Sequence, residues 1–114
     1  MQQKLLDERG GQRTFAVVLE TGDEALSSLQ SFVRDQRVRA AQITAIGAFS
    51  DVVLKYFDWK TKKYLDNRVD EQVEVASLIG DVATAPSGEP ALHIHLVVGR
   101  RDGTAKRTFG RPWK

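Results

Sequence analysis

The only two histidines of the chain, His93 and His95, stand one residue apart in the apolar segment Leu92-His93-Ile94-His95-Leu96. In a β-strand, side chains at positions i and i+2 point to the same face of the sheet, about 6–7 Å apart. The two imidazoles would therefore stand side by side, and could ligate one metal ion such as zinc or bind one acidic ligand. The alternative is a histidine pair that hydrogen-bonds to neighbours on a half-buried sheet face, because two histidines without a third ligand are a weak motif.

The acids expected nearest to this histidine segment are Glu74, Asp81 and Glu89. Glu74 stands between Val73 and Val75 in an alternating segment, so it would point away from both valines. We therefore predict Glu74 as a candidate for a polar ligand pocket, with a solvent-facing carboxylate as the alternative. The chain has no cysteine, no glycine-rich phosphate loop and no serine nucleophile elbow, so the residues give no indication of catalysis.

The end of the chain is basic, although the net charge of the whole chain is only +2. From Arg100 onward, Asp102 is the lone acid among several cations, and such a segment can contact the phosphates of DNA. The predicted nucleic-acid contacts are Arg100, Arg101, Lys106, Arg107 and Arg111. The alternative is a solvated basic tail.

A second basic segment combines lysines with aromatic residues around Trp59. Its aromatic side chains could stack on nucleic-acid bases while its lysines contact phosphates. The alternative is an exposed hairpin with cross-strand aromatic pairs. The residues in question are Lys55, Tyr56, Trp59, Lys60, Lys62, Lys63 and Tyr64.

The composition is that of one globular domain. Of the 114 residues, 41% are hydrophobic and 28% are charged, as in soluble proteins. No apolar run of about eighteen residues is present, and the first residues lack the apolar core of a signal peptide. The lack of cysteine excludes disulfides and thiolate metal sites. These features predict a cytoplasmic protein without a membrane-spanning segment.

Hydrophobic periodicity predicts one helix among about six strands. Apolar residues recur at three- and four-residue steps from Ala25 to about Gln36, after Thr21 and Glu24 at the spacing of a capping box. Strands are expected at 13–20, 40–49, 52–58, from 63, at 72–82 and at 91–98, with tight or bent points at Gly47 and Gly80. Because turns connect most of these strands, the predicted fold class is α+β, with a largely antiparallel sheet and one main helix.

Four blocks of the chain together resemble the plant- and prokaryote-conserved (PPC) domain. They are Phe15 to Glu24, Ala40 to Ser50, Val73 to Gly80, and Pro90 to Leu96 followed by Asp102-Gly103. The resemblance divides the chain into an N-terminal extension at 1–12, a PPC-like domain at 13–105 and an atypical basic tail at 106–114. It implies an antiparallel sheet with a helix packed on it, and assembly into a homotrimer.

The resemblance also has implications for a metal site. Some prokaryotic members carry three histidines able to hold a metal ion, two of which match His93 and His95. The third belongs to a Gly-Gly-His-Leu segment, where this chain reads Lys106-Arg107-Thr108-Phe109. Zinc is therefore expected in a member with all three histidines. We expect a truncation or frameshift after Ala105, because one permitted codon choice for 106–114 encodes Ser-Gly-His-Leu when read from its second base.

Two functions follow from these observations. The resemblance implies a stand-alone PPC-domain protein, a DNA-binding or regulatory module that trimerises and has no established catalytic activity. The alternative is a metal- or small-ligand-binding protein that uses the His93 and His95 strand, with metal-dependent hydrolysis as the chemistry such a site could perform.

Overall fold

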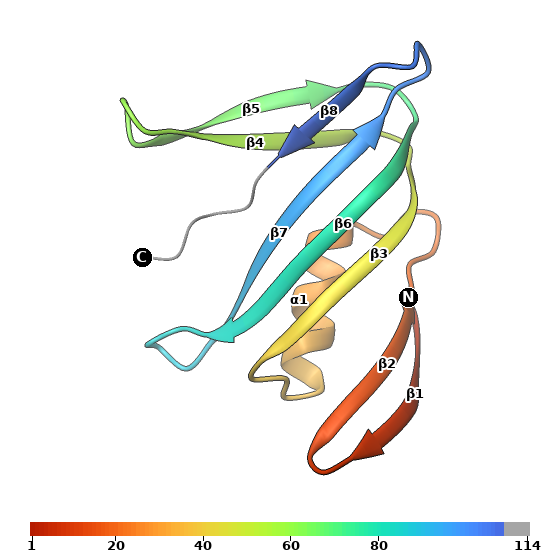
Figure 1. Ribbon diagram of the computed structural model, residues 1–114, viewed down its shortest axis with the longest axis vertical. Helices are drawn as coiled ribbons and strands as arrows, with labels where there is room; N and C mark the ends of the chain where they lie inside the picture. Colours follow the sequence, from red (N-terminus) through yellow and green to blue (C-terminus); the bar gives the residue numbers. More distant parts are fainter. Residues whose placement is uncertain (109–114) are drawn as a thin grey trace. The chain divides into compact units, whose positions relative to one another are not determined.

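The computed structural model describes residues 1–108, which form eight strands and one helix (Figure 1). The elements in chain order are β1 (Gln2–Arg9), β2 (Gln12–Val18), α1 (Ala25–Asp35), β3 (Ala41–Phe49), β4 (Val52–Asp58), β5 (Lys63–Val69), β6 (Val73–Thr84), β7 (Pro90–Gly99) and β8 (Ala105–Thr108). Every strand pair is antiparallel. The predicted combination of antiparallel strands with one main helix is confirmed for this part of the chain.

The chain divides into two compact units, Met1–Arg37 and Val38–Lys114. In the first, β1 and β2 form a hairpin in which Arg9 pairs with Gln12. Gly10 and Gly11 connect them with φ angles of 55° and 83°, the left-handed geometry that a two-residue hairpin turn requires. The segment 1–12, which we expected to be an extension, therefore supplies a complete strand.

Helix α1 belongs to this first unit and begins later than a Thr21 capping box would place it. The carboxylate of Glu24 is itself the N-cap and accepts a hydrogen bond from the Ser27 N–H at 2.6 Å. On the apolar side of the helix, Phe32 meets Phe15 of β2 edge to face, with ring centroids 5.1 Å apart. At its C-terminus, the Arg13 guanidinium donates to the Gln36 carbonyl at 2.7 Å, which satisfies one of the unpaired carbonyls of a helix end.

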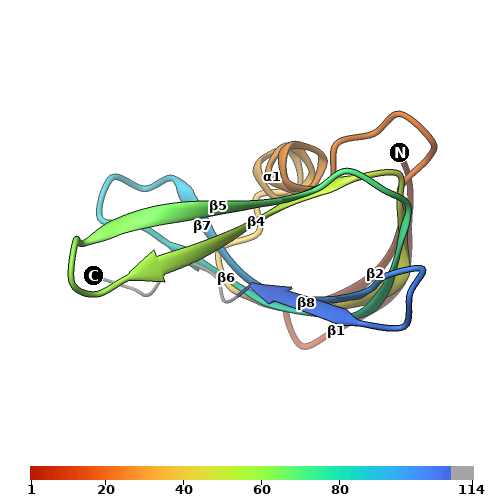
Figure 2. The ribbon, with the colours of Figure 1, turned by 90° about the horizontal axis from the view of Figure 1, so that it is seen from above.

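The second unit contains a four-stranded sheet of order β3-β6-β7-β8 and a separate hairpin, β4-β5. The hairpin crosses the end of the sheet at which β7 ends and β8 begins (Figures 1 and 2). Leu54 and Val69 of the hairpin join the buried core, whose other members come from β6 and β7: Val73, Val75, Leu78, Leu96 and Val98. One face of the sheet is thus apolar and covered, and the other is free to carry polar residues.

Irregularities in two strands set which residues reach each face. In β6 the register shifts between Val75 and Ser77, so Val75 and Leu78 both point into the core although they are three residues apart. In β3 the register shifts between Ala45 and Gly47, where φ is 156°. Gly47 thus marks a bulge and not a close approach, since a Cβ there would meet nothing within 4 Å.

Strand β8 includes the first three residues of the segment expected to be a basic tail. Lys106, Arg107 and Thr108 pair with Val98, Val97 and Leu96 of β7. Arg111, one of the predicted nucleic-acid contacts, lies outside the described residues. Within residues 1–108, no helix is long and apolar enough to cross a membrane.

Candidate functional site

His93 and His95 lie on one face of β7, as the sequence predicts. Their ring centroids are 5.0 Å apart and the rings meet edge to face at 79°. Leu96 and Val98 point to the opposite face and are buried in the core. His93 is half-buried and His95 is exposed, so a ligand could reach both imidazoles from the uncovered side of the sheet.

The neighbouring strands complete a surface that we call the histidine face: Gln42, Thr44, Ile79, Asp81, His93 and His95. Asp81 of β6 is the direct partner of His93 in the ladder, and Gln42 of β3 is the partner of Asp81. In the same way, Ile79 of β6 is the direct partner of His95, and Thr44 of β3 is the partner of Ile79. Directly paired residues carry their side chains on the same face, with Cβ atoms about 4.5–5.5 Å apart. A carboxylate and an amide therefore stand in one row with His93.

Glu74 lies on the same face but not beside the histidines. It pairs with Gly99, four residues further along β7 than His95, which corresponds to about 13 Å of strand. The acid next to His93 is instead Asp81. Glu74 is exposed, and its role as a pocket residue stays a prediction.

A metal ion needs more ligands than this face groups together. Within residues 1–108, no three histidine or carboxylate side chains are clustered in a way that could hold a metal ion. Tetrahedral zinc sites use four protein ligands, or three with a water. The described residues therefore do not fit the zinc site that the family resemblance implies, although His93 and His95 could supply two of its ligands.

Within residues 1–108, four of the predicted nucleic-acid contacts lie in or next to the turn between β7 and β8: Arg100, Arg101, Lys106 and Arg107. Asp102 fixes this turn, because its Oδ1 accepts hydrogen bonds from the Thr104 hydroxyl at 2.6 Å and the Thr104 N–H at 2.9 Å. The same two bonds lower the pKa of Asp102, the hydroxyl having the larger effect. Arg101 projects from this turn and is exposed.

Arg100 is not a free cation. Its Nε donates to Glu71 Oε1 at 2.5 Å, and both side chains are 34% exposed. This hydrogen bond is the main reason why the pKa of Arg100 is raised. Lys106 and Arg107 are exposed on β8, and they point to opposite faces of the sheet because they are consecutive in a strand. Arg107 shares its face with the histidines, since it pairs with Val97.

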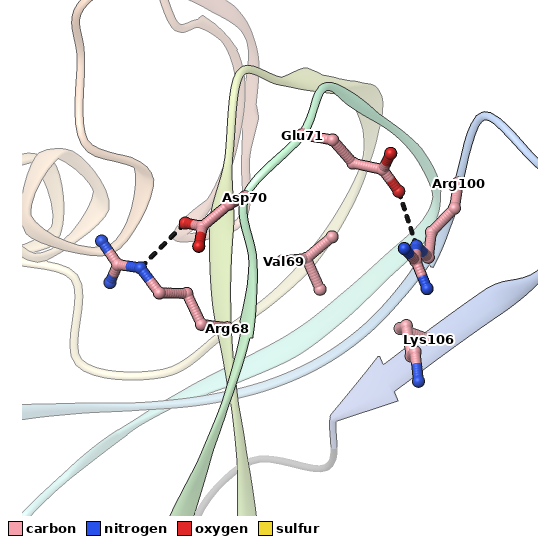
Figure 3. A pocket seen from close by; sticks show the side chains of 6 residues that line it. All are labelled: Arg68, Val69, Asp70, Glu71, Arg100 and Lys106. Atoms are coloured by element: carbon pink, nitrogen blue, oxygen red, sulfur yellow. Dashed lines mark hydrogen bonds and ion pairs between the residues drawn. The ribbon is translucent and has the colours of Figure 1, made fainter.

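A polar pocket of about 310 Å³ lies beside Arg100 and Lys106. Its lining consists of Arg68, Val69, Asp70, Glu71, Arg100 and Lys106. Figure 3 shows two ion pairs in it, Arg100 with Glu71 and Arg68 with Asp70, the latter at 2.8 Å. Two of the three cations are thus neutralised. Sequence reasoning missed Glu71 because it lies 29 residues from Arg100, and no local pattern links the two.

The family of this chain follows from comparison with known proteins. The model of the Plants and Prokaryotes Conserved (PCC) domain matches residues 6–110, so the chain belongs to this family. No curated protein sequence matches it.

Solved structures agree with the family assignment. A plant- and prokaryote-conserved (PPC) protein from Pyrococcus horikoshii is 27% identical with a TM-score of 0.75, over 81% of this chain and 64% of that protein. A metal-containing protein from Archaeoglobus fulgidus is 30% identical with a TM-score of 0.73, over 82% and 65%. A "putative DNA binding protein" from Bacteroides thetaiotaomicron is 30% identical with a TM-score of 0.70, over 75% and 59%. The chain thus spans less than two thirds of each of these proteins.

Proposed function

We propose that this PPC-domain chain is a non-enzymatic, self-associating module that binds duplex DNA weakly through the turn between β7 and β8. The observation that carries the proposal is a pair of exposed cations, Arg101 and Lys106, that have no ion-pair partner within residues 1–108. The name of the Bacteroides relative supports DNA as the partner. A DNA-binding function would agree with the cytoplasmic location that the composition predicts.

Phosphate contacts made by such cations carry no base recognition, so binding should be independent of sequence and sensitive to salt. Each neutralised phosphate adds about 0.9 to the slope of log affinity against log salt concentration. We expect the double substitution Arg101→Gln and Lys106→Gln to lower that slope by almost two, measured by fluorescence anisotropy on a labelled duplex.

Substitution is preferable to deletion of residues 106–114, because deletion would also remove part of β8. Lys4→Gln is the matched control: Lys4 is an exposed lysine of β1 with no ion-pair partner among the described residues. A slope that is the same in the double variant and the wild type would refute the proposal, as would sequence-specific binding that survives the double substitution.

A second candidate function is the binding of a small ligand or metal ion by the histidine face. The row formed by His93 and Asp81 favours it, and the Archaeoglobus relative is named a metal-containing protein. Changes in the imidazole resonances of His93 and His95 on addition of divalent metals or small carboxylates would test it. Unchanged resonances with every probe would rule it out.

A further inference from the structure

The turn between β4 and β5 presents an exposed tryptophan among lysines. Trp59 is 62% exposed, and Lys60, Lys62 and Lys63 follow it in the chain. We call these four residues the hairpin tip. The hairpin tip belongs neither to the turn between β7 and β8 nor to the histidine face, and the proposed function does not use it.

The backbone of the hairpin tip is held in place by Asp58. One carboxylate oxygen accepts from the Lys60 N–H at 3.0 Å and the other from the Thr61 hydroxyl at 3.1 Å. The Asp58 carbonyl also accepts from the Lys62 N–H at 2.7 Å, where φ is 59°. The nearest acid is thus engaged in forming the turn, and the tip is presented in a defined conformation.

The charge of the hairpin is positive and concentrated at the tip. Between Val52 and Val69 there are five cationic and two acidic side chains. Of the acids, Asp66 pairs with Lys55 at 2.8 Å and Asp58 fixes the turn. Lys60, Lys62 and Lys63 have no carboxylate partner among the described residues. The tip is therefore suited to a polyanion.

The indole of Trp59 is held by two neighbouring side chains although most of it is exposed. Phe57 meets it edge to face, with centroids 5.2 Å apart, and Phe57 is itself 5.2 Å from Tyr64. The ammonium of Lys62 lies 4.4 Å from the indole centroid, over one face of the ring. These contacts position the indole, and most of the Trp59 side chain stays accessible to a planar partner.

We propose that the hairpin tip binds single-stranded nucleic acid, with an unpaired base stacked on Trp59 and the flanking phosphates held by Lys60, Lys62 and Lys63. Stacking on an aromatic side chain next to cations is how proteins hold single strands without sequence preference. Duplex bases are already stacked and cannot reach the indole. An anionic membrane is a poorer partner, because Trp59 is the one apolar side chain of the turn, beside three lysines and Thr61.

The test uses an oligothymidylate of about ten nucleotides and follows the fluorescence of Trp59. Trp113, outside the described residues, is replaced first (Trp113→Phe), so that the signal comes from one indole. We expect the oligonucleotide to quench Trp59, and Trp59→Ala to weaken binding by about tenfold or more in anisotropy. Trp59→Phe should lose less, because a smaller ring remains. Lys60→Gln with Lys63→Gln should lower the salt slope by about 0.7 for each lost phosphate contact, and Lys4→Gln should leave it unchanged.

Three results would overturn this inference: unchanged oligonucleotide binding in Trp59→Ala, equal dependence of duplex and single-strand binding on Trp59, or a Trp59 response to phosphatidylserine vesicles without one to the oligonucleotide. The duplex proposal fails separately. If Arg101→Gln with Lys106→Gln leaves duplex binding intact while Trp59→Ala abolishes single-strand binding, duplex binding by the turn between β7 and β8 is refuted. Single-strand binding by the hairpin tip is then supported. Urea midpoints of the variants equal to that of the wild type would exclude unfolding as the cause.

Discussion

Asp81 of β6 and His93 of β7 are directly opposed in the antiparallel ladder, so their side chains share the uncovered face of the sheet. The bulge between Val75 and Ser77 makes this compatible with a continuous core, because it lets Val75 and Leu78 both point inward. Without the extra residue, one half of β6 would present its valines to the histidine face. The set of side chains on the histidine face therefore depends on a single bulge in β6.

The histidine face should bind zinc weakly. His93 and His95 supply two ligands, and the described residues contain no cluster of three. By this ligand count we expect a dissociation constant weaker than about 1 μM in calorimetric titration of the apo protein.

His93→Ala and His95→Ala should each abolish the residual heat of zinc binding, and Lys4→Gln serves as the control. Tighter binding that is lost in either histidine variant would contradict this expectation and would imply a further ligand, from Asp81 or from a second copy of the chain.

The turn between β7 and β8 should loosen in acid. Hydrogen bonds from the Thr104 hydroxyl and N–H lower the pKa of Asp102. A carboxyl whose pKa is lower in the folded chain than in the unfolded chain stabilises the fold above its unfolded pKa, of about 4. That contribution is lost as the pH falls through the lower folded pKa.

We expect an NMR titration to give Asp102 a pKa below its ordinary value, and Thr104→Val to shift it back upward by removing the hydroxyl. The protection factor of the Thr104 amide, which is the exchange rate of an unstructured peptide at the same pH divided by that of the amide, should fall correspondingly in acid. Asp102→Asn should remove the acid dependence of that protection factor, and an unchanged pKa in Thr104→Val would assign the shift to another cause.

Several parts of the fold could be predicted from the sequence because they depend on local periodicity. The helix at Ala25–Asp35 follows from its apolar spacing, and the shared face of His93 and His95 follows from the period of two in any strand. Strand β1 gave no such signal, since all its residues are exposed and no face alternates. Its one clue was the Gly10-Gly11 pair, a two-residue hairpin turn in sequence as in structure.

Relationships between strands could not be predicted in the same way. Glu74 was predicted as a pocket residue because it alternates with Val73 and Val75. Such alternation determines which face of the sheet a side chain lies on, but not which residue of the next strand lies beside it. Asp81 became the partner of His93 through the turn that joins β6 to β7, because the register runs unbroken from that turn to Ser77. The ion pair of Arg100 with Glu71 likewise depends on tertiary placement.

The chain should associate in solution. The family resemblance implies a homotrimer, and β3 and β8 are sheet edges whose backbone groups can pair with another strand. On β3, Ile46 is 86% exposed, which is costly for a large apolar side chain. Light scattering should give three times the chain mass of 12.7 kDa.

Ile46→Lys should shift this mass towards that of the monomer, whereas Leu26→Lys, at an exposed position of α1, should not. A monomer of the wild-type chain at micromolar concentration would contradict trimer formation.

Gly80 of β6 faces β7, the strand of the two histidines, at a distance that leaves no room for a side chain. A Cβ there would lie 2.9 Å from the His93 carbonyl oxygen and 3.0 Å from Ile94 Cγ1, so β7 would have to move where it carries His93. Overpacking of this kind costs about 1–3 kcal/mol, and we expect Gly80→Ala to lower the free energy of unfolding in urea by that amount. Gly99→Ala is the matched control on β7, because a Cβ at Gly99 meets nothing within 4 Å. Equal stability of the two variants would mean that β6 and β7 separate at Gly80 without cost.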